Sequence, residues 1–273
     1  MPRKKIETKY IQPAHNLILK NPGVWKNKIL IGTPSTGLVR MEWVMARFGQ
    51  IIPVNWSSTD AIQWISTFAP LRYLVADAQN LICRTVVEQD FEWLLLIESD
   101  NVLPPDAFLR INDYMRKGKI PVVSGLYFTK SDPPEPLLFR KRGTSYYGDW
   151  KMGDRVWVDG VPTGFVLIHG SIIKAMWKES PEYMLGAQIT RRIFECPEKI
   201  WHDPETDSRH ALIGTSDLAW CERVMKEGFF KKSGWPEFQK KEFPFLVDTN
   251  IFLKHIDDSG RQFPLQDPKS LGF

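Results

Sequence analysis

The sequence predicts an α/β fold with an open, mostly parallel sheet, and two patterns support this prediction. The continuously apolar runs KILIG (residues 28–32) and WLLLI (residues 93–97) have the length of strands that are buried on both faces. Other segments repeat their apolar residues at helical spacing, as residues 38–48 and 73–88 do. Strands that alternate with helices in this way are typical of a central sheet covered by helices.

The predicted elements follow in order from the first strand, residues 28–32, which ends in the hydroxyl-rich loop 33–37. Residues 1–27 are read as a polar tail, 28–257 as a single domain and 258–273 as a C-terminal tail. Residues 180–214, rich in charge and proline, are expected to form a loop or insertion over the site. The remaining expectations are helices at 38–48, 73–88, from Pro104 onward, at 171–177 and at 216–227 with Ser216 as N-cap, and strands at 51–56, 93–97, 120–128, 156–158, 165–169 and 245–253.

The composition is that of a globular protein and argues against a membrane-spanning or disulfide-rich one. With 273 residues, 43% of them apolar, the chain can build a substantial core. Its apolar runs are too short to span a bilayer, and the N-terminus lacks the apolar segment of a signal peptide. Three widely spaced cysteines argue against a disulfide framework. We therefore expect a soluble, cytoplasmic protein with no transmembrane segment.

The strongest candidate site follows the strand at residues 93–97, where the apolar run stops at Glu98, Ser99 and Asp100. In an open α/β sheet the carboxyl end of a strand faces the ligand crevice. Two carboxylates separated by one residue can there meet a divalent cation that carries phosphate oxygens. The alternative is structural: Asp100 caps the turn and Glu98 is solvated.

Seven segments resemble, in their order, the landmarks of nucleotide-sugar-dependent glycosyltransferases of the GT-A fold, in particular the family 2-like branch. The resemblance covers residues 28–256 and implies a Rossmann-like, mixed but mostly parallel central sheet flanked by helices. The segments are KILIGTPSTG, DAQNLICRTV, WLLLIESDNVLPPDAFLRI, VVSGLYF, VDGVPTGFVLI, SDLAWCERVMKEG and LVDTNIFLKH.

This resemblance implies catalytic and metal-binding roles. Asp100 stands at the last aspartate of the family's DxD motif and would ligate Mn²⁺ or Mg²⁺, with His255 after the late strand as a second ligand. Glu98, in place of the first aspartate, would ligate the cation or contact the ribose or a bound water. Asp217 would be the general base, because an acceptor hydroxyl is a poor nucleophile until a carboxylate takes its proton.

The resemblance also implies a set of residues for the nucleotide sugar. The loop after the first strand would meet the nucleobase and ribose, and a glycine near residue 164 would let the backbone approach the donor sugar or acceptor. Gln79 stands where the branch commonly has arginine, and Arg84 lies one turn later. The expected donor-binding residues are Thr33, Pro34, Ser35, Gln79, Arg84, Glu98, Ser99 and Gly164.

The implied reaction is transfer of a sugar from a nucleoside diphosphate sugar to an acceptor hydroxyl, with inversion favoured by analogy. The acceptor is left open between a glycan, a small molecule and a modified nucleobase in DNA. A nucleotidyltransferase is one alternative, because it would also use acids at a strand end, but it would usually need a basic loop that binds phosphate. A non-catalytic nucleic-acid-binding protein is the other alternative, suggested by the basic N-terminus and the lysine-rich segment 228–241.

Overall fold

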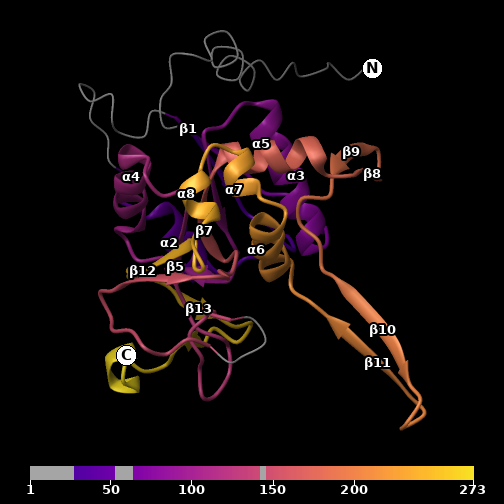
Figure 1. The fold of residues 1–273 in the computed structure, drawn as a ribbon. Helices are drawn as coiled ribbons and strands as arrows, with labels where there is room; N and C mark the ends of the chain where they lie inside the picture. Colours follow the sequence, from indigo (N-terminus) through magenta and orange to yellow (C-terminus); the bar gives the residue numbers. More distant parts are fainter. Residues whose placement is uncertain (1–27, 53–63, 142–145) are drawn as a thin grey trace, which may run out of the picture.

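The computed structural model describes residues 28–52, 64–141 and 146–273, and its centre is a seven-stranded mixed sheet (Figure 1). The strand order is β2-β1-β3-β7-β5-β12-β6, and five strands run in one direction while β7 and β6 run opposite to them. This confirms the predicted α/β class with a mostly parallel sheet. The strands are β1 (Lys28–Gly32), β2 (Trp64–Phe68), β3 (Trp93–Ile97), β5 (Val122–Leu126), β6 (Arg155–Val158), β7 (Phe165–His169) and β12 (Phe245–Phe252).

Helices cover both faces of the sheet, which explains why β3 is apolar at every position (Figure 1). Leu94 and Leu96 of β3 pack into an apolar cluster with α3, α5, α6, α7 and α8. Trp93, Leu95 and Ile97 point to the other face, into a cluster with α2 and α4. The helices are α2 (Met41–Phe48), α3 (Val75–Glu88), α4 (Ala107–Lys117), α5 (Gly170–Glu179), α6 (Ser216–Lys226), α7 (Phe229–Lys232) and α8 (Pro236–Gln239).

Two sequence predictions, a strand at 51–56 and a helix N-cap at Ser216, differ from the structure. Ile51 and Ile52 are not in a strand, and the rest of the predicted strand at 51–56 lies outside the described residues. The strand that pairs in parallel with β1 is β2 instead. The predicted helix N-cap at Ser216 is also wrong by one residue, because α6 begins at Ser216 and Thr215 is its N-cap.

The segment 180–214, expected to form a loop or an insertion, is mostly β structure. It contains one short hairpin, β8 (Glu182–Leu185) with β9 (Gln188–Arg191), and a longer one, β10 (Glu198–Asp203) with β11 (Ser208–Ile213). The longer hairpin projects away from the body of the protein (Figure 1). Its strand β10 is exposed along almost its whole length, so it carries little of the hydrophobic alternation that identifies a strand in a sequence.

Asn80 of α3 ties the short β8–β9 hairpin region to the body. Its buried side chain accepts the backbone N–H groups of Ile193 and Phe194 at 3.0 and 2.8 Å, and donates to the Phe194 carbonyl at 2.9 Å and the Tyr183 hydroxyl at 3.0 Å. We expect Asn80→Ala to lower the free energy of unfolding by about 3 kcal/mol, because it leaves several buried polar groups unpaired. Urea unfolding measures this loss.

The control for this substitution is Arg84→Ala on the same helix. Arg84 pairs with Glu88 at 2.6 Å, and its side chain is 30% exposed and that of Glu88 53%. An exposed pair of this kind contributes about 0.5 kcal/mol. A loss for Asn80→Ala no larger than that of Arg84→Ala would contradict the structural role given to Asn80.

His169, the N-cap of α5, makes stability depend on pH. Burial, followed by the charge of Lys174, lowers the pKa of His169 to about 4. The unfolded chain therefore binds this proton more readily, so the stabilisation is complete above about pH 6.5 and is lost as the pH falls toward 4. We expect the free energy of unfolding of the wild type to fall by about 2 kcal/mol more between pH 7.5 and pH 5 than that of His169→Asn, which keeps a capping side chain. Parallel pH profiles for the two proteins would contradict this expectation.

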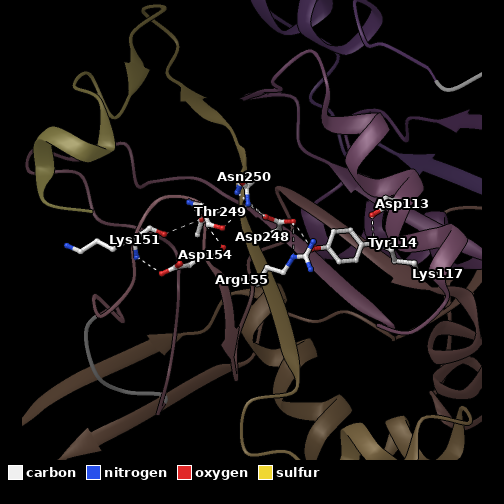
Figure 2. Close-up of polar contacts among 10 residues, drawn as sticks. Asp113, Tyr114, Lys117, Lys151, Asp154, Arg155, Asp248, Thr249 and Asn250 are labelled. Carbon is white, nitrogen blue, oxygen red and sulfur yellow. Dashed lines mark hydrogen bonds and ion pairs between the residues drawn. The ribbon is translucent and has the colours of Figure 1, made fainter.

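A buried carboxylate, Asp248, marks the point where β12 leaves regular pairing (Figure 2). Its Oδ2 accepts a hydrogen bond from the Tyr114 hydroxyl of α4 at 2.6 Å, and its Oδ1 accepts the backbone N–H and side-chain amide of Asn250 at 3.0 and 2.9 Å. β12 pairs with β5 up to Asp248 and resumes only at Phe252, so the residues between them form a bulge. After it the chain enters β13 (Lys254–Ile256), which joins β14 (Gln262–Phe263) and β4 (Asn101–Val102) in a small sheet.

The bulge requires a glycine in the neighbouring strand. A Cβ on Gly125 of β5 would lie 2.7 Å from the Ile251 carbonyl and 2.5 Å from Leu253 Cδ1. The C-terminal residues are packed as well, since Phe273 stacks on Trp150 with ring centroids 4.6 Å apart. No helix in the described part of the chain is long and apolar enough to cross a membrane.

Candidate functional site

The candidate site lies where the neighbouring strands β1 and β3 end. Because these strands are parallel and adjacent, the loops that follow them meet at one edge of the sheet. A cavity of about 210 Å³ opens there, and a second cavity of about 590 Å³ shares the lining residues Thr36, Ser99 and Asp100 with it. The first cavity is lined by Pro34, Ser35, Thr36, Tyr73, Val75, Glu98, Ser99 and Asp100. Of the predicted donor-binding residues, Pro34, Ser35, Glu98 and Ser99 thus lie at this cavity.

Asp100 and His255 are brought together by the small sheet. Asn101 of β4 pairs with His255 of β13, and the Asp100 carbonyl accepts the Ile256 N–H at 2.8 Å. As a result His255 Nε2 lies 3.3 Å from Asp100 Oδ2, while His255 Nδ1 lies 2.9 Å from the Phe128 carbonyl oxygen. A carbonyl accepts but cannot donate, so Nδ1 carries a proton and Nε2 is the nitrogen directed at the carboxylate.

Lys130 completes the surroundings of Asp100. Its Nζ lies 2.6 Å from the same oxygen, Asp100 Oδ2, that faces His255. Burial alone would raise the pKa of Asp100, but the hydrogen bonds and charges of His255 and Lys130 outweigh it and bring this pKa to about 2. Asp100 is therefore a carboxylate at any pH near neutrality.

Glu98 lies in a different polar environment from Asp100. Its Oε1 accepts a hydrogen bond from the buried Thr163 hydroxyl at 3.3 Å, and that hydroxyl accepts one from Gln79 Nε2 at 3.0 Å. Burial, then the charges of Asp100 and Asp217, raise the pKa of Glu98 to about 8. The structure thus connects Glu98 with Gln79 through Thr163.

Asp217 lies in the first turn of α6 and belongs to the same electrostatic cluster, since its charge raises the pKa of Glu98. Packing sets its position: Cys221 of α6 contacts the Val161 backbone, with 3.4 Å from the Val161 nitrogen to Cys221 Sγ. A Cβ on Gly160 would lie 2.8 Å from Leu218 Cδ2, so α6 approaches the 160–164 segment closely. Asp217 Oδ1 accepts the Leu218 N–H at 2.8 Å, which is typical of an acid at a helix start.

Gly164 directly precedes β7 and contacts Glu98 and Tyr127. Its carbonyl accepts the Glu98 N–H at 3.0 Å, and its own N–H donates to the Tyr127 hydroxyl at 2.8 Å. A Cβ at this position would lie 2.2 Å from the Tyr127 hydroxyl oxygen and 2.4 Å from Asn101 Nδ2. In this structure the glycine thus allows a close approach to side chains of the protein itself.

Two other predicted residues lie apart from the cavity lining. Thr33, the first residue of the loop after β1, is buried and donates its N–H to the Phe68 carbonyl at 3.0 Å. Its hydroxyl oxygen has no hydrogen-bond partner among the described residues. Arg84 pairs with Glu88 on the outside of α3. Their predicted contacts with a donor remain predictions.

Two residues of this site, Asp100 and His255, could hold a cation whose shell was completed by other ligands. Among the described residues no group of three or more His, Cys, Asp or Glu side chains is placed to hold a metal. Asp100 and His255 nevertheless offer one oxygen and one nitrogen 3.3 Å apart, close to the roughly 3.0 Å between neighbouring ligands of an octahedral ion with 2.1 Å bonds. Ions such as Mg²⁺ commonly take only one or two protein ligands and complete their shell with substrate phosphates and water.

The residues of this site that sequence reasoning missed include Lys130, Tyr127 and Thr163. Lys130 follows the predicted strand at 120–128, so the strand-end rule that identified Asp100 could have identified it too. Tyr127 and Thr163 lie inside the segments VVSGLYF and VDGVPTGFVLI, in which the sequence predicts a role for Gly164 alone. Only their contacts in space reveal them.

Comparison with known proteins finds similarity to solved structures but none to a protein family or a curated sequence. No protein family model matches this chain, and no curated protein matches it in sequence. Among solved structures, A197 from STIV is 13% identical, with a TM-score of 0.48 over 88% of this chain and 95% of that one. A putative glucose-1-phosphate thymidylyltransferase from Bacillus anthracis, determined with sucrose, is 11% identical, with a TM-score of 0.30 over 56% of this chain and 76% of that one.

A third structure is a glycosyltransferase involved in the glycosylation of the major capsid of PBCV-1. It is 15% identical, with a TM-score of 0.25 over 55% of this chain and 65% of that one. The neighbours in structure thus include a glycosyltransferase and a nucleotidyltransferase. At TM-scores below 0.5 these likenesses say nothing about the reaction of this chain.

Proposed function

We propose that this protein is a nucleotide-sugar-dependent glycosyltransferase that moves a sugar from a nucleoside diphosphate to an acceptor hydroxyl. The observation that carries the proposal is the convergence of Asp100, His255 and Asp217 at one strand-end site. Asp100 is separated from Asp217 and from His255 by more than a hundred positions in the chain. Asp100 nevertheless contacts His255, and the charges of both Asp100 and Asp217 act on Glu98. Their order and types are those that the sequence resemblance implies.

In this proposal the loop after β1 holds the nucleoside, because Pro34 and Ser35 of this loop line the smaller cavity together with Tyr73, which follows β2. Asp100 and His255 hold Mn²⁺ or Mg²⁺, which supplies positive charge to the leaving diphosphate. Asp217 accepts the proton of the acceptor hydroxyl as that oxygen attacks the anomeric carbon. Attack from the face opposite the diphosphate would invert the anomeric centre. The acceptor is a hydroxyl of a glycan, a small molecule or a modified nucleobase in DNA.

The test is a screen of nucleoside diphosphate sugars for binding and hydrolysis with Mn²⁺, with Mg²⁺ and with chelator. We expect one donor to bind and to be hydrolysed slowly in a cation-dependent manner. Hydrolysis reports on the donor half of the reaction, so the screen does not require the acceptor to be known. If no donor binds in any condition, the proposal is wrong.

The same screen separates a nucleotidyltransferase from a glycosyltransferase. Each nucleoside triphosphate is incubated with a sugar 1-phosphate, and pyrophosphate release is measured. Release of pyrophosphate together with formation of a nucleotide sugar would replace the proposed reaction with nucleotidyl transfer. We expect neither product.

A further inference from the structure

Lys130 contacts the oxygen of Asp100 that a cation would use. Its ammonium lies 2.6 Å from Asp100 Oδ2, the oxygen that also faces His255 Nε2 at 3.3 Å. A divalent ion bound to this oxygen at about 2.1 Å would lie no more than about 4.7 Å from the ammonium in its present position. Two positive charges at that distance repel each other in a partly buried site. The ammonium and the divalent ion are thus alternative partners of the same oxygen.

The surroundings of Lys130 allow its ammonium to take a second position. Its side chain is 32% exposed and lines the larger cavity together with Ser99 and Asp100. The phosphates of any nucleotide that shares a cation with Asp100 must lie within a few ångströms of this carboxylate. A flexible side chain with four methylene groups can therefore reach phosphate oxygens without any movement of the backbone.

We propose that Lys130 is a two-position residue, which neutralises Asp100 while the site is empty and contacts the diphosphate of the donor once a divalent cation has taken Asp100. The inference rests on the proposed function for the identity of the donor. It goes beyond that function by assigning a residue that binds the diphosphate and by predicting that this residue opposes the cation in the free protein.

The test uses the full chain and the variant Lys130→Met, which keeps the length of the side chain and removes its charge. The first measurement is titration with Mn²⁺ alone, followed by the electron paramagnetic resonance signal of the free ion. We expect Lys130→Met to bind Mn²⁺ about threefold to fivefold more tightly than the wild type, the size of a partly exposed ion pair. The second measurement is binding of inorganic pyrophosphate in the presence of saturating Mn²⁺. Here we expect about tenfold weaker binding, because a charge-assisted hydrogen bond is lost.

Two further variants make the result specific. Lys174→Met removes an ion pair with Asp90 of the same 2.6 Å length, in which Lys174 is 31% exposed, and it should change neither measurement. Lys130→Arg keeps the charge and should restore pyrophosphate binding. A purely structural surface ion pair at Lys130 would leave both affinities unchanged, as in Lys174→Met.

The outcomes separate this inference from the proposed function. Three outcomes would overturn the role of Lys130: equal Mn²⁺ affinity in the wild type and Lys130→Met, absence of Mn²⁺ binding in both, or unchanged pyrophosphate affinity. None of them decides whether the protein transfers sugar, which the screen of nucleotide sugars tests separately. The expected shifts together with no hydrolysis of any nucleotide sugar would support Lys130 as a diphosphate ligand and reject the glycosyltransferase.

Discussion

Replacing Asp217 with asparagine is expected to reduce sugar transfer by about 10³-fold, the usual scale of a lost general base. The amide has the same shape and can occupy the same first turn of α6, but it cannot accept a proton. Because Asp100 and His255 remain in place, donor binding should stay within about twofold of the wild type. The measurements are the transfer rate at saturating donor and the dissociation constant of the donor by calorimetry.

Asp106→Asn is the matched control for this variant. Asp106 is the N-cap of α4 and pairs with Arg110 at 2.7 Å, so it is also an acid at a helix start. It should transfer sugar at the wild-type rate. Unchanged transfer in Asp217→Asn would remove Asp217 as the base, whereas loss of donor binding together with transfer would place it at the donor instead.

Asp100→Asn should abolish the cation-dependent turnover of donor, with a fall of at least about 10²-fold. The amide oxygen carries no net charge, so the cation loses its anionic ligand and His255 alone cannot hold it. Affinity for Mn²⁺ should fall together with turnover, and the unfolding temperature should show that the fold is kept. Calorimetric Mn²⁺ titration and donor hydrolysis are measured on the same preparation.

Asp113→Asn provides the comparison for Asp100→Asn. Asp113 also has an ammonium partner, Lys117 at 2.5 Å, but it lies on an exposed part of α4. Loss of that pair should affect neither Mn²⁺ affinity nor turnover. Full activity in Asp100→Asn, with cation dependence retained, would show that the reaction does not use this carboxylate.

The sequence predicted those parts of the fold and site that depend on local pattern. The run from Trp93 to Ile97 is apolar at every position because the strand is covered on both faces, so both its existence and the strand-end position of Asp100 were visible. The hairpin β10–β11 was missed because β10 is exposed along almost its whole length and therefore shows no alternation of buried and exposed residues. β2 was missed because the apolar residues Ile51 and Ile52 offered a nearer alternative.

Contacts between distant segments were beyond sequence reasoning for a different reason. Gln79 and Thr163 are 84 positions apart, and their hydrogen bond depends on how α3 and the 160–164 segment pack on the sheet. A glutamine or a threonine in a sequence does not indicate which distant residue it will bind. His255 was found only through the resemblance in motif order, since a lone histidine after a strand has no pattern of its own.

The buried contact between Asp248 and Tyr114 has a consequence for the evolution of the site (Figure 2). The bulge in β12 sets how many residues separate the central sheet from His255, and its anchoring partner is on α4. Substitutions in the core beneath α4 can therefore shift the imidazole relative to Asp100 without altering either side chain. Under the proposed function, such substitutions would change the affinity for the cation although the substituted residues contact neither Asp100 nor His255.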